Sequence, residues 1–291
     1  MSKKPSAGGK IQWTKMFRKL SPYTIRKGFR YMKHYGPKEF WIRLHERFEP
    51  EEVPYGPWYE AYRPDEETLE KQRKRKFPDG PLISIVVPAY LTPERFLRQM
   101  LDSLLAQTYE NWELCLANGS PEDPDMQTVL RSYAEMDRRI RYQDLKENLG
   151  IAENTNAAFA MAEGDFIALL DHDDLLAPNA LYEIAAALEE HPEADLAFCG
   201  SRQVMLDGAG NRTGEEFDRA ISDEHLKMIS EDWRDLYIGD YIGAPSATIY
   251  RKGAPEYEEK LTWIVDVEFY MRLLQRNPRF VVSKEPLVSI G

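Results

Sequence analysis

Residues 164–174 read Gly-Asp-Phe-Ile-Ala-Leu-Leu-Asp-His-Asp-Asp, an apolar run that ends in three carboxylates and a histidine. The apolar part, 166–170, has the length and side chains of a buried strand. Carboxylates grouped at a strand end repel one another unless a cation lies among them, and oxygen ligands favour a hard ion such as Mg²⁺ or Mn²⁺. An acidic loop that caps a helix beginning near Pro178, with Asp174 as the capping residue, would have the same composition. The cluster alone leaves both interpretations open.

The segments around this stretch alternate between strand and helix patterns. Apolar, β-branched runs predict strands at 83–87, 112–117, 139–143, 166–170 and 196–199. Helical spacing of apolar residues predicts helices at 93–106, 124–136, 151–162 and 178–190. Beyond residue 200 the pattern is less regular and predicts a hairpin around 203–210, strands at 247–250 and 280–283, and a helix at 265–275. The alternation predicts an α/β domain with a mostly parallel sheet and helices on both faces.

Polar and aromatic residues gather where the predicted parallel strands end, which is where such sheets bind ligands. They are Pro88, Ala89 and Tyr90 after the first strand, Asn118 after the second, and Asn148, Gly150, Asn154 and Asn156 at the start of a helix. An aromatic ring beside a backbone edge could hold a nucleobase. These positions lie on successive strand ends, so together they predict a nucleotide site.

The composition of the 291-residue chain, 43% hydrophobic and 30% charged, is that of a globular protein. No run of about 18 apolar residues occurs, which excludes a membrane-spanning helix, and the basic start lacks the apolar core of a secretory signal. Cys115 and Cys199 are the only cysteines, which excludes a disulfide scaffold and a four-cysteine zinc site. We therefore expect a reduced, cytoplasmic compartment.

The charge is unevenly divided along the chain. Residues 1–47 carry 13 Lys and Arg against two Glu, a net charge of +11, so the rest of a chain of total charge −11 carries −22. Apolar stripes at helical spacing predict a basic, amphipathic helical arm over residues 1–48. Such a helix suits an anionic membrane surface, at the inner face of the cell membrane. Packing of the stripes on the acidic body, with solvated charges, is the alternative.

Residues 49–81 form a connector punctuated by prolines. Its second part, 66–77, predicts a helix that ends in a run of Lys and Arg. A nucleic-acid patch is one interpretation of that run, and cations favoured by the helix dipole are the other, which we prefer. Because the body of the chain is acidic, we expect no nucleic-acid partner.

Five stretches occur in the order and spacing typical of one enzyme family. They are 83–90 (Ile-Ser-Ile-Val-Val-Pro-Ala-Tyr), 107–114 (Gln-Thr-Tyr-Glu-Asn-Trp-Glu-Leu), 148–150 (Asn-Leu-Gly), 164–174 and 265–268 (Val-Asp-Val-Glu). With them, residues 82–291 resemble family 2 of the inverting glycosyltransferases, in particular bacterial O-antigen and rhamnan-type members. The resemblance implies the GT-A fold, a mostly parallel sheet with a Rossmann-like nucleotide-binding half flanked by helices, here with an N-terminal helical extension.

The resemblance also implies roles for the matching residues. Asp171 and Asp173 match the family's DxD motif, in which Asp173 would ligate a Mn²⁺ or Mg²⁺ ion at the donor diphosphate and Asp171 would contact the ribose or the metal shell. Pro88, Ala89 and Tyr90 would line a uridine or thymidine pocket, and we add Asn118, Asn148, Gly150 and Asn156 to the donor side. Asp266 would be the catalytic base. The acceptor side would include Gly243, Ala244, Pro245, Trp263 and Glu268.

Structural roles stay open for several of these residues. Tyr90 could be a turn aromatic and Trp263 a core residue. Asp266 could cap the helix that follows it, and Glu268 could be a solvated acid of the first turn. Many family members carry an acidic residue where this chain has Asn118, which puts the base preference in doubt.

The implied activity is metal-dependent, inverting transfer of a sugar from a UDP- or dTDP-linked donor to a hydroxyl of a glycan or lipid-linked acceptor, in bacterial surface polysaccharide synthesis. The chain stops before the family's usual His-bearing segment, as a truncated or short form would. A non-catalytic GT-A module that serves as a partner scaffold is the alternative. A sugar nucleotidyltransferase is disfavoured, because no Gly-rich triphosphate loop with a following Lys comes after the first strand.

Overall fold

The computed structural model describes residues 64–204, 217–219, 221–237, 239–261 and 264–290, together with a few positions between 26 and 41. The chain divides into two units, Met1–Val53 and Pro54–Gly291. In the first unit, the described positions other than Gly36 are helical. Most of the predicted arm, the connector up to residue 63, the turn at 207–210 and Trp263 lie outside the described residues, so these remain predictions. In the part of the chain that is described, no helix is both long and apolar enough to span a bilayer.

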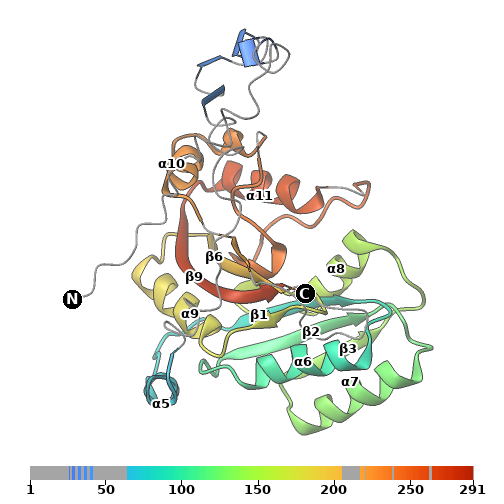
Figure 1. The fold of residues 1–291 in the computed structure, drawn as a ribbon. Helices are drawn as coiled ribbons and strands as arrows, with labels where there is room; N and C mark the ends of the chain where they lie inside the picture. The colour runs from blue at the N-terminus through green and yellow to red at the C-terminus, as the bar shows by residue number, and fades with distance from the viewer. Residues whose placement is uncertain are drawn as a thin grey trace. The chain divides into compact units, whose positions relative to one another are not determined.

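Within its described residues, the second unit is built on a nine-stranded sheet with helices on its faces (Figure 1). The strands are β1 Ile83–Ala89, β2 Trp112–Asn118, β3 Ile140–Asp144, β4 Phe166–Leu169, β5 Leu175–Leu176, β6 Leu196–Gln203, β7 Phe217–Arg219, β8 Thr248–Arg251 and β9 Phe280–Ile290. The helices are α5 Glu66–Lys74, α6 Glu94–Leu105, α7 Pro124–Met136, α8 Ile151–Phe159, α9 Ala180–Glu190, α10 Asp223–Glu231 and α11 Val265–Arg276, with 3-10 turns η1 Trp233–Tyr237 and η2 Pro245–Ala247. Every strand and helix predicted between residues 83 and 199 is present.

The strand order is β3-β2-β1-β4-β8-β6-β9-β5, with β7 paired to β6. β3, β2, β1 and β4 are parallel neighbours, as the alternation predicted. β8 is inserted antiparallel between β4 and β6, so the second half of the sheet is mixed. The chain moves outward from β1 through β2 to β3 and then returns to β4 on the other side of β1. The carboxyl ends of β1 and β4 therefore flank a topological switch point.

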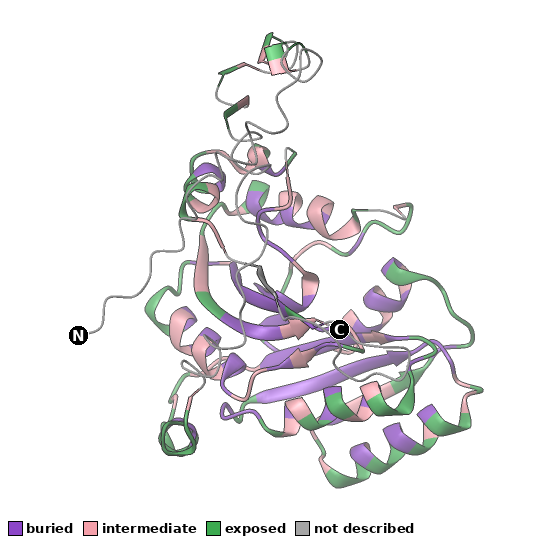
Figure 2. Cartoon of the chain, in the orientation of Figure 1, coloured by how far each residue is buried: buried purple, intermediate pink, exposed green. Residues whose placement is uncertain are grey.

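The helices cover the sheet as right-handed crossovers require. α6 and α7 lie side by side, and α8, which returns the chain to β4, packs against β1 and β2. α6 buries a stripe made of Leu97, Met100, Leu101 and Leu104, as apolar residues at i, i+3, i+4 and i+7 should. Figure 2 shows the outcome, with buried strands and helices that are exposed on their outer faces. The sheet is thus a rigid base whose carboxyl edge stays open.

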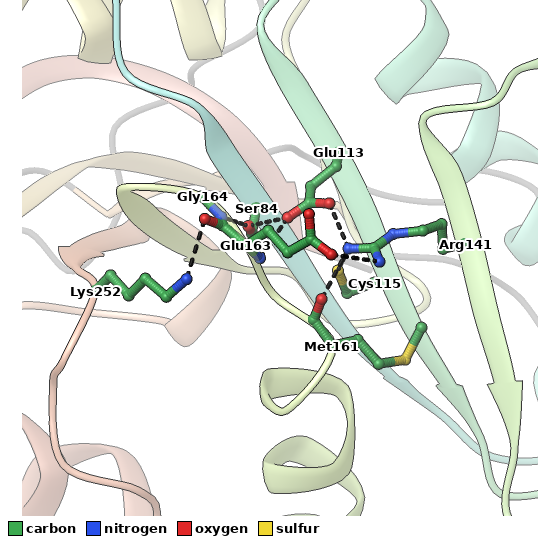
Figure 3. A network of polar contacts seen from close by, with 8 residues as sticks. All are labelled: Ser84, Glu113, Cys115, Arg141, Met161, Glu163, Gly164 and Lys252. Atoms are coloured by element: carbon green, nitrogen blue, oxygen red, sulfur yellow. Dashed lines mark hydrogen bonds and ion pairs between the residues drawn. The ribbon is translucent and has the colours of Figure 1, made fainter.

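A buried polar network joins the amino ends of the four parallel strands, at the edge opposite the switch point (Figure 3). Its centre is Glu113 of β2, which accepts hydrogen bonds from Ser84 Oγ at 2.6 Å and from the backbone N–H of Glu163 at 2.7 Å. Arg141 of β3 donates to the same carboxylate at 2.5 Å and to the carbonyl of Met161 at 2.7 Å. One carboxylate therefore ties β1, β2, β3 and the turn before β4 together.

We expect Glu113→Gln to lower the free energy of unfolding by about 2 kcal/mol, because it removes a buried charge partner of Arg141. Burial alone would raise the pKa of Glu113, but the hydrogen bonds from Ser84 and Glu163 and the Arg141 charge hold it below its usual value of 4.5. A carboxylate of this kind contributes stability at neutral pH and loses that contribution as the pH falls below the unfolded-state pKa. Urea unfolding from pH 7 down to pH 3 should therefore show a steeper loss in the wild-type chain than in the variant.

Glu110→Gln is the matched control. Glu110 is exposed and lies 3.6 Å from Lys76, so its replacement should change the free energy of unfolding by less than about 0.5 kcal/mol. Equal losses in the two variants, or parallel pH dependence of wild type and Glu113→Gln, would contradict the role given to this network.

Candidate functional site

The acidic loop begins at the carboxyl end of β4, at the switch point. The N–H of Leu170 still bonds to a carbonyl of β1 at 3.0 Å, so the chain leaves the sheet only after that residue. The three carboxylates then differ in their surroundings. Asp173 is exposed, Asp171 is half-buried, and Asp174 is only 2% exposed. Asp174 is therefore part of the interior, whereas the other two can meet a ligand.

Ser246 of η2 holds the acidic loop to the second half of the sheet. The antiparallel register of β4 and β8 pairs Ala168 with Ile249, and continuing it by three residues brings Asp171 opposite Ser246. The Ser246 hydroxyl accepts the N–H of Asp171 at 2.9 Å and donates to Asp174 Oδ2 at 2.6 Å. One hydroxyl thus bonds to both ends of the loop.

The capping interpretation of Asp174 is wrong. The N-cap position of α9 belongs to Asn179, without a side-chain cap bond, while Asp174 accepts the Ser246 hydroxyl.

Three carboxylates act on one another at this edge. Burial raises the pKa of Asp171 above its ordinary value, the Asp173 charge raises it further, His172 opposes the rise, and Asp266 adds to it. A divalent cation would relieve this repulsion. Among the described residues, no group of three or more His, Cys, Asp or Glu side chains could hold a metal ion by itself. A cation here would therefore need further oxygen ligands from a bound molecule.

Asp266 is the second residue of α11. The N-cap of the helix is Ile264, in the left-handed region at φ 51°, so the interpretation of Asp266 as the cap is wrong. Its Oδ1 accepts the N–H of Val267 at 2.9 Å. Glu268 makes a bidentate ion pair with Arg272 at 2.7 and 2.8 Å. Of the two acids in this turn, the carboxylate without a cationic partner among the described residues is that of Asp266.

Tyr90 presents an aromatic ring at the carboxyl end of β1. It is 43% exposed, whereas Pro88 is half-buried and Ala89 is buried. Gly119, after β2, donates its N–H to the Ala89 carbonyl at 2.8 Å. A β-carbon on Gly119 would lie 3.1 Å from Asn154 Nδ2 and 3.5 Å from the Tyr90 ring. The glycine therefore lets the ends of β1 and β2 and the helix α8 converge beside the exposed ring.

Asn118 lies inside the fold rather than at the surface. It is fully buried, its Nδ2 donates to Asp144 Oδ1 at 2.8 Å, and its Oδ1 accepts the N–H of Ser120 at 2.9 Å. The predicted contact with a nucleotide has no support in this geometry. Asp144 ends β3 at the same edge with an exposed side chain, and its Oδ1 accepts hydrogen bonds from Asn118 and Gln127. The sequence analysis did not single it out, although the end of the third strand carries the same signal as the other strand ends.

Asn148 and Gly150 belong to a loop that Asn154 holds in shape. Asn154 donates to Asn148 Oδ1 at 2.7 Å and accepts the N–H of Leu149 at 3.1 Å. Gly150 has φ 95°, in the left-handed region that favours glycine. The loop lies at the carboxyl edge before α8, and its contact with a donor remains a prediction.

Asn156 of α8 pairs with the backbone of Tyr257. Its Nδ2 donates to the Tyr257 carbonyl at 3.1 Å, and its Oδ1 accepts the Tyr257 N–H at 3.0 Å. Both amide atoms are engaged in this way, so the side chain supports the segment before α11. The geometry gives Asn156 this supporting role where a donor contact was predicted.

The predicted acceptor wall leads into η2. Gly243 adopts φ 112° and donates its N–H to Asp240 Oδ1 at 2.9 Å. Ala244 and Pro245 are half-buried and precede Ser246 directly. These residues are therefore joined to the acidic loop through a single serine.

The family described as Glycosyl transferase family 2 matches residues 84–256. The uncharacterized protein y4gI of Sinorhizobium fredii is 35% identical over 208 residues, which cover 69% of this chain and 21% of that protein. The O-antigen biosynthesis protein RfbC of Myxococcus xanthus is 33% identical over 180 residues, which cover 62% of this chain and 14% of that protein. The chain thus spans about a fifth or less of the length of these two relatives.

Two solved structures share the fold. S. aureus TarS 1-349 in complex with UDP has a TM-score of 0.57 at 23% identity, covering 72% of this chain and 60% of that one. The mannosyltransferase PcManGT from Pyrobaculum calidifontis, in complex with GDP-Man and Mn²⁺, has a TM-score of 0.52 at 14% identity, covering 76% of this chain and 62% of that one.

We expect Ser246→Ala to lower the free energy of unfolding by about 1–3 kcal/mol, because the Asp171 N–H and the Asp174 carboxylate lose a partner in a buried place. Urea unfolding measures this loss. The control is Ser230→Ala, since the exposed Ser230 donates only to a carbonyl of its own helix, at 2.7 Å, and its loss should stay below about 0.5 kcal/mol. Similar losses of unfolding free energy in the two variants would show that Ser246 does not hold the acidic loop to the second half of the sheet.

Proposed function

Because the chain belongs to glycosyltransferase family 2 and has the GT-A fold, we propose that it is a metal-dependent, inverting glycosyltransferase that moves a sugar from a nucleotide-diphosphate donor to a hydroxyl of a glycan or lipid-linked acceptor. Glycosyl transfer itself follows from the family. The observation that carries the finer proposal concerns Asp171, a half-buried carboxylate at the carboxyl end of β4. The charges of Asp173 and of Asp266, which is far away in the sequence, both act on it.

The proposed donor is a UDP- or dTDP-linked sugar. The exposed ring of Tyr90, beside the backbone of Ala89, suits a nucleobase. The exposed Asp144 carboxylate offers an acceptor of the kind that the ring N–H of uracil or thymine needs. The complex of TarS with UDP supports a uridine nucleotide, and that of the Pyrobaculum enzyme with GDP-Man supports a sugar nucleotide in general.

Asp173 and Asp171 are the residues that would hold a divalent cation, Mn²⁺ or Mg²⁺. Their donor set, carboxylate oxygens only, fits a hard ion, and the repulsion that raises the pKa of Asp171 is the condition that such an ion relieves. The diphosphate of the donor would supply the remaining oxygens. When bound, the ion neutralises charge on the departing diphosphate.

Asp266 would act as general base on the acceptor. Its carboxylate accepts the proton of the acceptor hydroxyl while that oxygen forms a bond to the anomeric carbon. The bond from this carbon to the diphosphate oxygen breaks on the opposite face, so the configuration inverts. The ion pair of Glu268 with Arg272 supports Asp266 as the base, because both oxygens of the Glu268 carboxylate are already engaged by the guanidinium.

The acceptor side would comprise Gly243, Ala244, Pro245, Trp263 and Glu268. The name of the Myxococcus relative supports a bacterial surface glycan as product. Residues 1–48 would bring the chain to an anionic, cytoplasmic membrane surface where a lipid-linked acceptor is found. Flotation with anionic vesicles of the full chain and of a chain lacking residues 1–47 distinguishes this docking from a solvated arm.

Calorimetric titration with UDP and with dTDP should show binding that needs Mn²⁺ or Mg²⁺. We expect Asp173→Asn to weaken this binding about tenfold or more, because it removes a charged ligand of the cation. Asp79→Asn, which changes an exposed acid before β1, should bind as the wild type does. Tight binding without any metal, or unchanged binding by Asp173→Asn, would refute the donor site.

We expect Asp266→Asn to lower kcat for transfer by about 10²–10⁴-fold, the usual worth of a general base. The Kd for UDP should stay within about twofold of wild type, because the base touches the acceptor and not the nucleotide. Glu259→Gln, an exposed acid before α11, serves as the control. An active Asp266→Asn variant, especially together with an inactive Glu268→Gln variant, would assign the role of general base to Glu268.

A further inference from the structure

The hydroxyl of Tyr257, in the segment between β8 and α11, is a buried polar group that the fold does not use. Tyr257 is 4% exposed, and its Oη finds no hydrogen-bond partner among the residues that the structure describes. Buried tyrosine hydroxyls usually have a partner, because an unsatisfied one keeps the full cost of desolvation. A hydroxyl left without a described partner at the edge of the proposed reaction site is available to form a hydrogen bond during the reaction.

Two contacts fix the position of Tyr257. Asn156 of α8 holds its backbone through two hydrogen bonds of 3.1 and 3.0 Å. Its ring stacks on Phe269 of α11, with centroids 4.5 Å apart and planes inclined by 6°. The backbone of Tyr257 is therefore anchored to α8 and its ring to α11.

The stack brings the ring to the face of α11 that carries the proposed base. Asp266 and Phe269 are three residues apart on the helix, so their side chains are neighbours. Burial raises the pKa of Tyr257 well above its ordinary value, and the carboxylates of Asp266 and Asp171 raise it further, against Arg272. The phenol therefore stays protonated and can donate a hydrogen bond to either carboxylate.

The two carboxylate oxygens of Asp266 differ in their contacts to the described residues. Oδ1 takes the Val267 N–H at 2.9 Å, and no hydrogen bond reaches Oδ2 within the described parts of the chain. We infer that Tyr257 is a positioning residue, whose hydroxyl donates to the Asp266 carboxylate in the acceptor complex and so directs that carboxylate at the acceptor hydroxyl. This inference rests on the proposed function, in which Asp266 is the base.

Tyr257→Phe removes the hydroxyl and keeps the stacked ring and both backbone hydrogen bonds. We expect kcat to fall about tenfold in the full chain, while KM for the donor stays within about twofold, because only the orientation of the base changes. A purely structural role would instead change thermal stability, or both kinetic constants together. Unchanged kcat would overturn the inference.

Tyr250→Phe is the matched control. Tyr250 is fully buried and its hydroxyl is also unpartnered among the described residues, and its ring contacts Phe269 at 4.8 Å. The groups that raise its pKa after burial are Tyr257 and Tyr270, with no carboxylate among them. Tyr250→Phe thus removes an equivalent hydroxyl from the same aromatic cluster. For this variant, kcat should stay within about twofold of wild type. An equal fall in both variants would overturn the inference.

A second readout needs no activity. The full chain is labelled with 3-fluorotyrosine, and the ¹⁹F resonances of Tyr257 and Tyr250 are assigned from the two Phe variants. In the presence of acceptor glycan, Asp266→Asn should shift the Tyr257 resonance and leave that of Tyr250 unmoved. An unmoved Tyr257 resonance would overturn the inference. If the wild-type chain transfers no sugar from any donor, the proposed function fails. If it transfers sugar and the Tyr257 resonance stays unmoved, the inference alone fails.

Discussion

One serine hydroxyl joins the two halves of the sheet at the point where chemistry is expected. Repulsion between the charges destabilises a loop with three carboxylates, and its backbone has left the hydrogen-bonded sheet. Ser246 supplies what the loop lacks, an acceptor for the Asp171 N–H and a donor for the Asp174 carboxylate. With the inner carboxylate satisfied in this way, the outer two remain available to a ligand. The segment before Ser246 is fixed at the same time, so donor and acceptor sides share one support.

The carboxylates at the two edges of the sheet have opposite electrostatic surroundings. At the amino edge, Glu113 of β2 accepts hydrogen bonds from three other strand-end segments, and its pKa is held low. At the carboxyl edge, Asp171 has acidic neighbours and a raised pKa. The first arrangement stabilises the folded chain, whereas the second costs stability until a ligand arrives. Preorganisation of a binding site requires this combination, in which a well-stabilised amino edge supports a carboxyl edge whose charges repel.

The sequence was informative where signals are local. Strand 166–170 and helix 93–106 were predicted from periodicity alone, and β4 and α6 confirm them within a residue or so. The inserted β8 was expected as a strand, but its antiparallel place between β4 and β6 depends on pairing between distant segments, which local patterns do not encode. The same reason explains why the contact of Asn118 was not foreseen. The sequence shows an amide after a strand, but not whether it binds a ligand or a neighbouring strand. Neither Tyr257 nor the hydrogen bonds of Ser246 to the acidic loop had any signal in the chain, because these contacts are set by packing.

The register of β4 and β8 has a consequence for how this site can change over evolutionary time. The Ser246 hydroxyl reaches Asp171 because each residue lies three positions beyond the Ala168–Ile249 pair, in opposite directions. A single insertion or deletion in either three-residue stretch would separate them, whatever the identity of the residues involved. The lengths of these two stretches are therefore coupled, although the stretches lie far apart in the gene. Only a matched change in both would restore the hydrogen bond. Substitutions within these stretches therefore disturb the site less than insertions or deletions do.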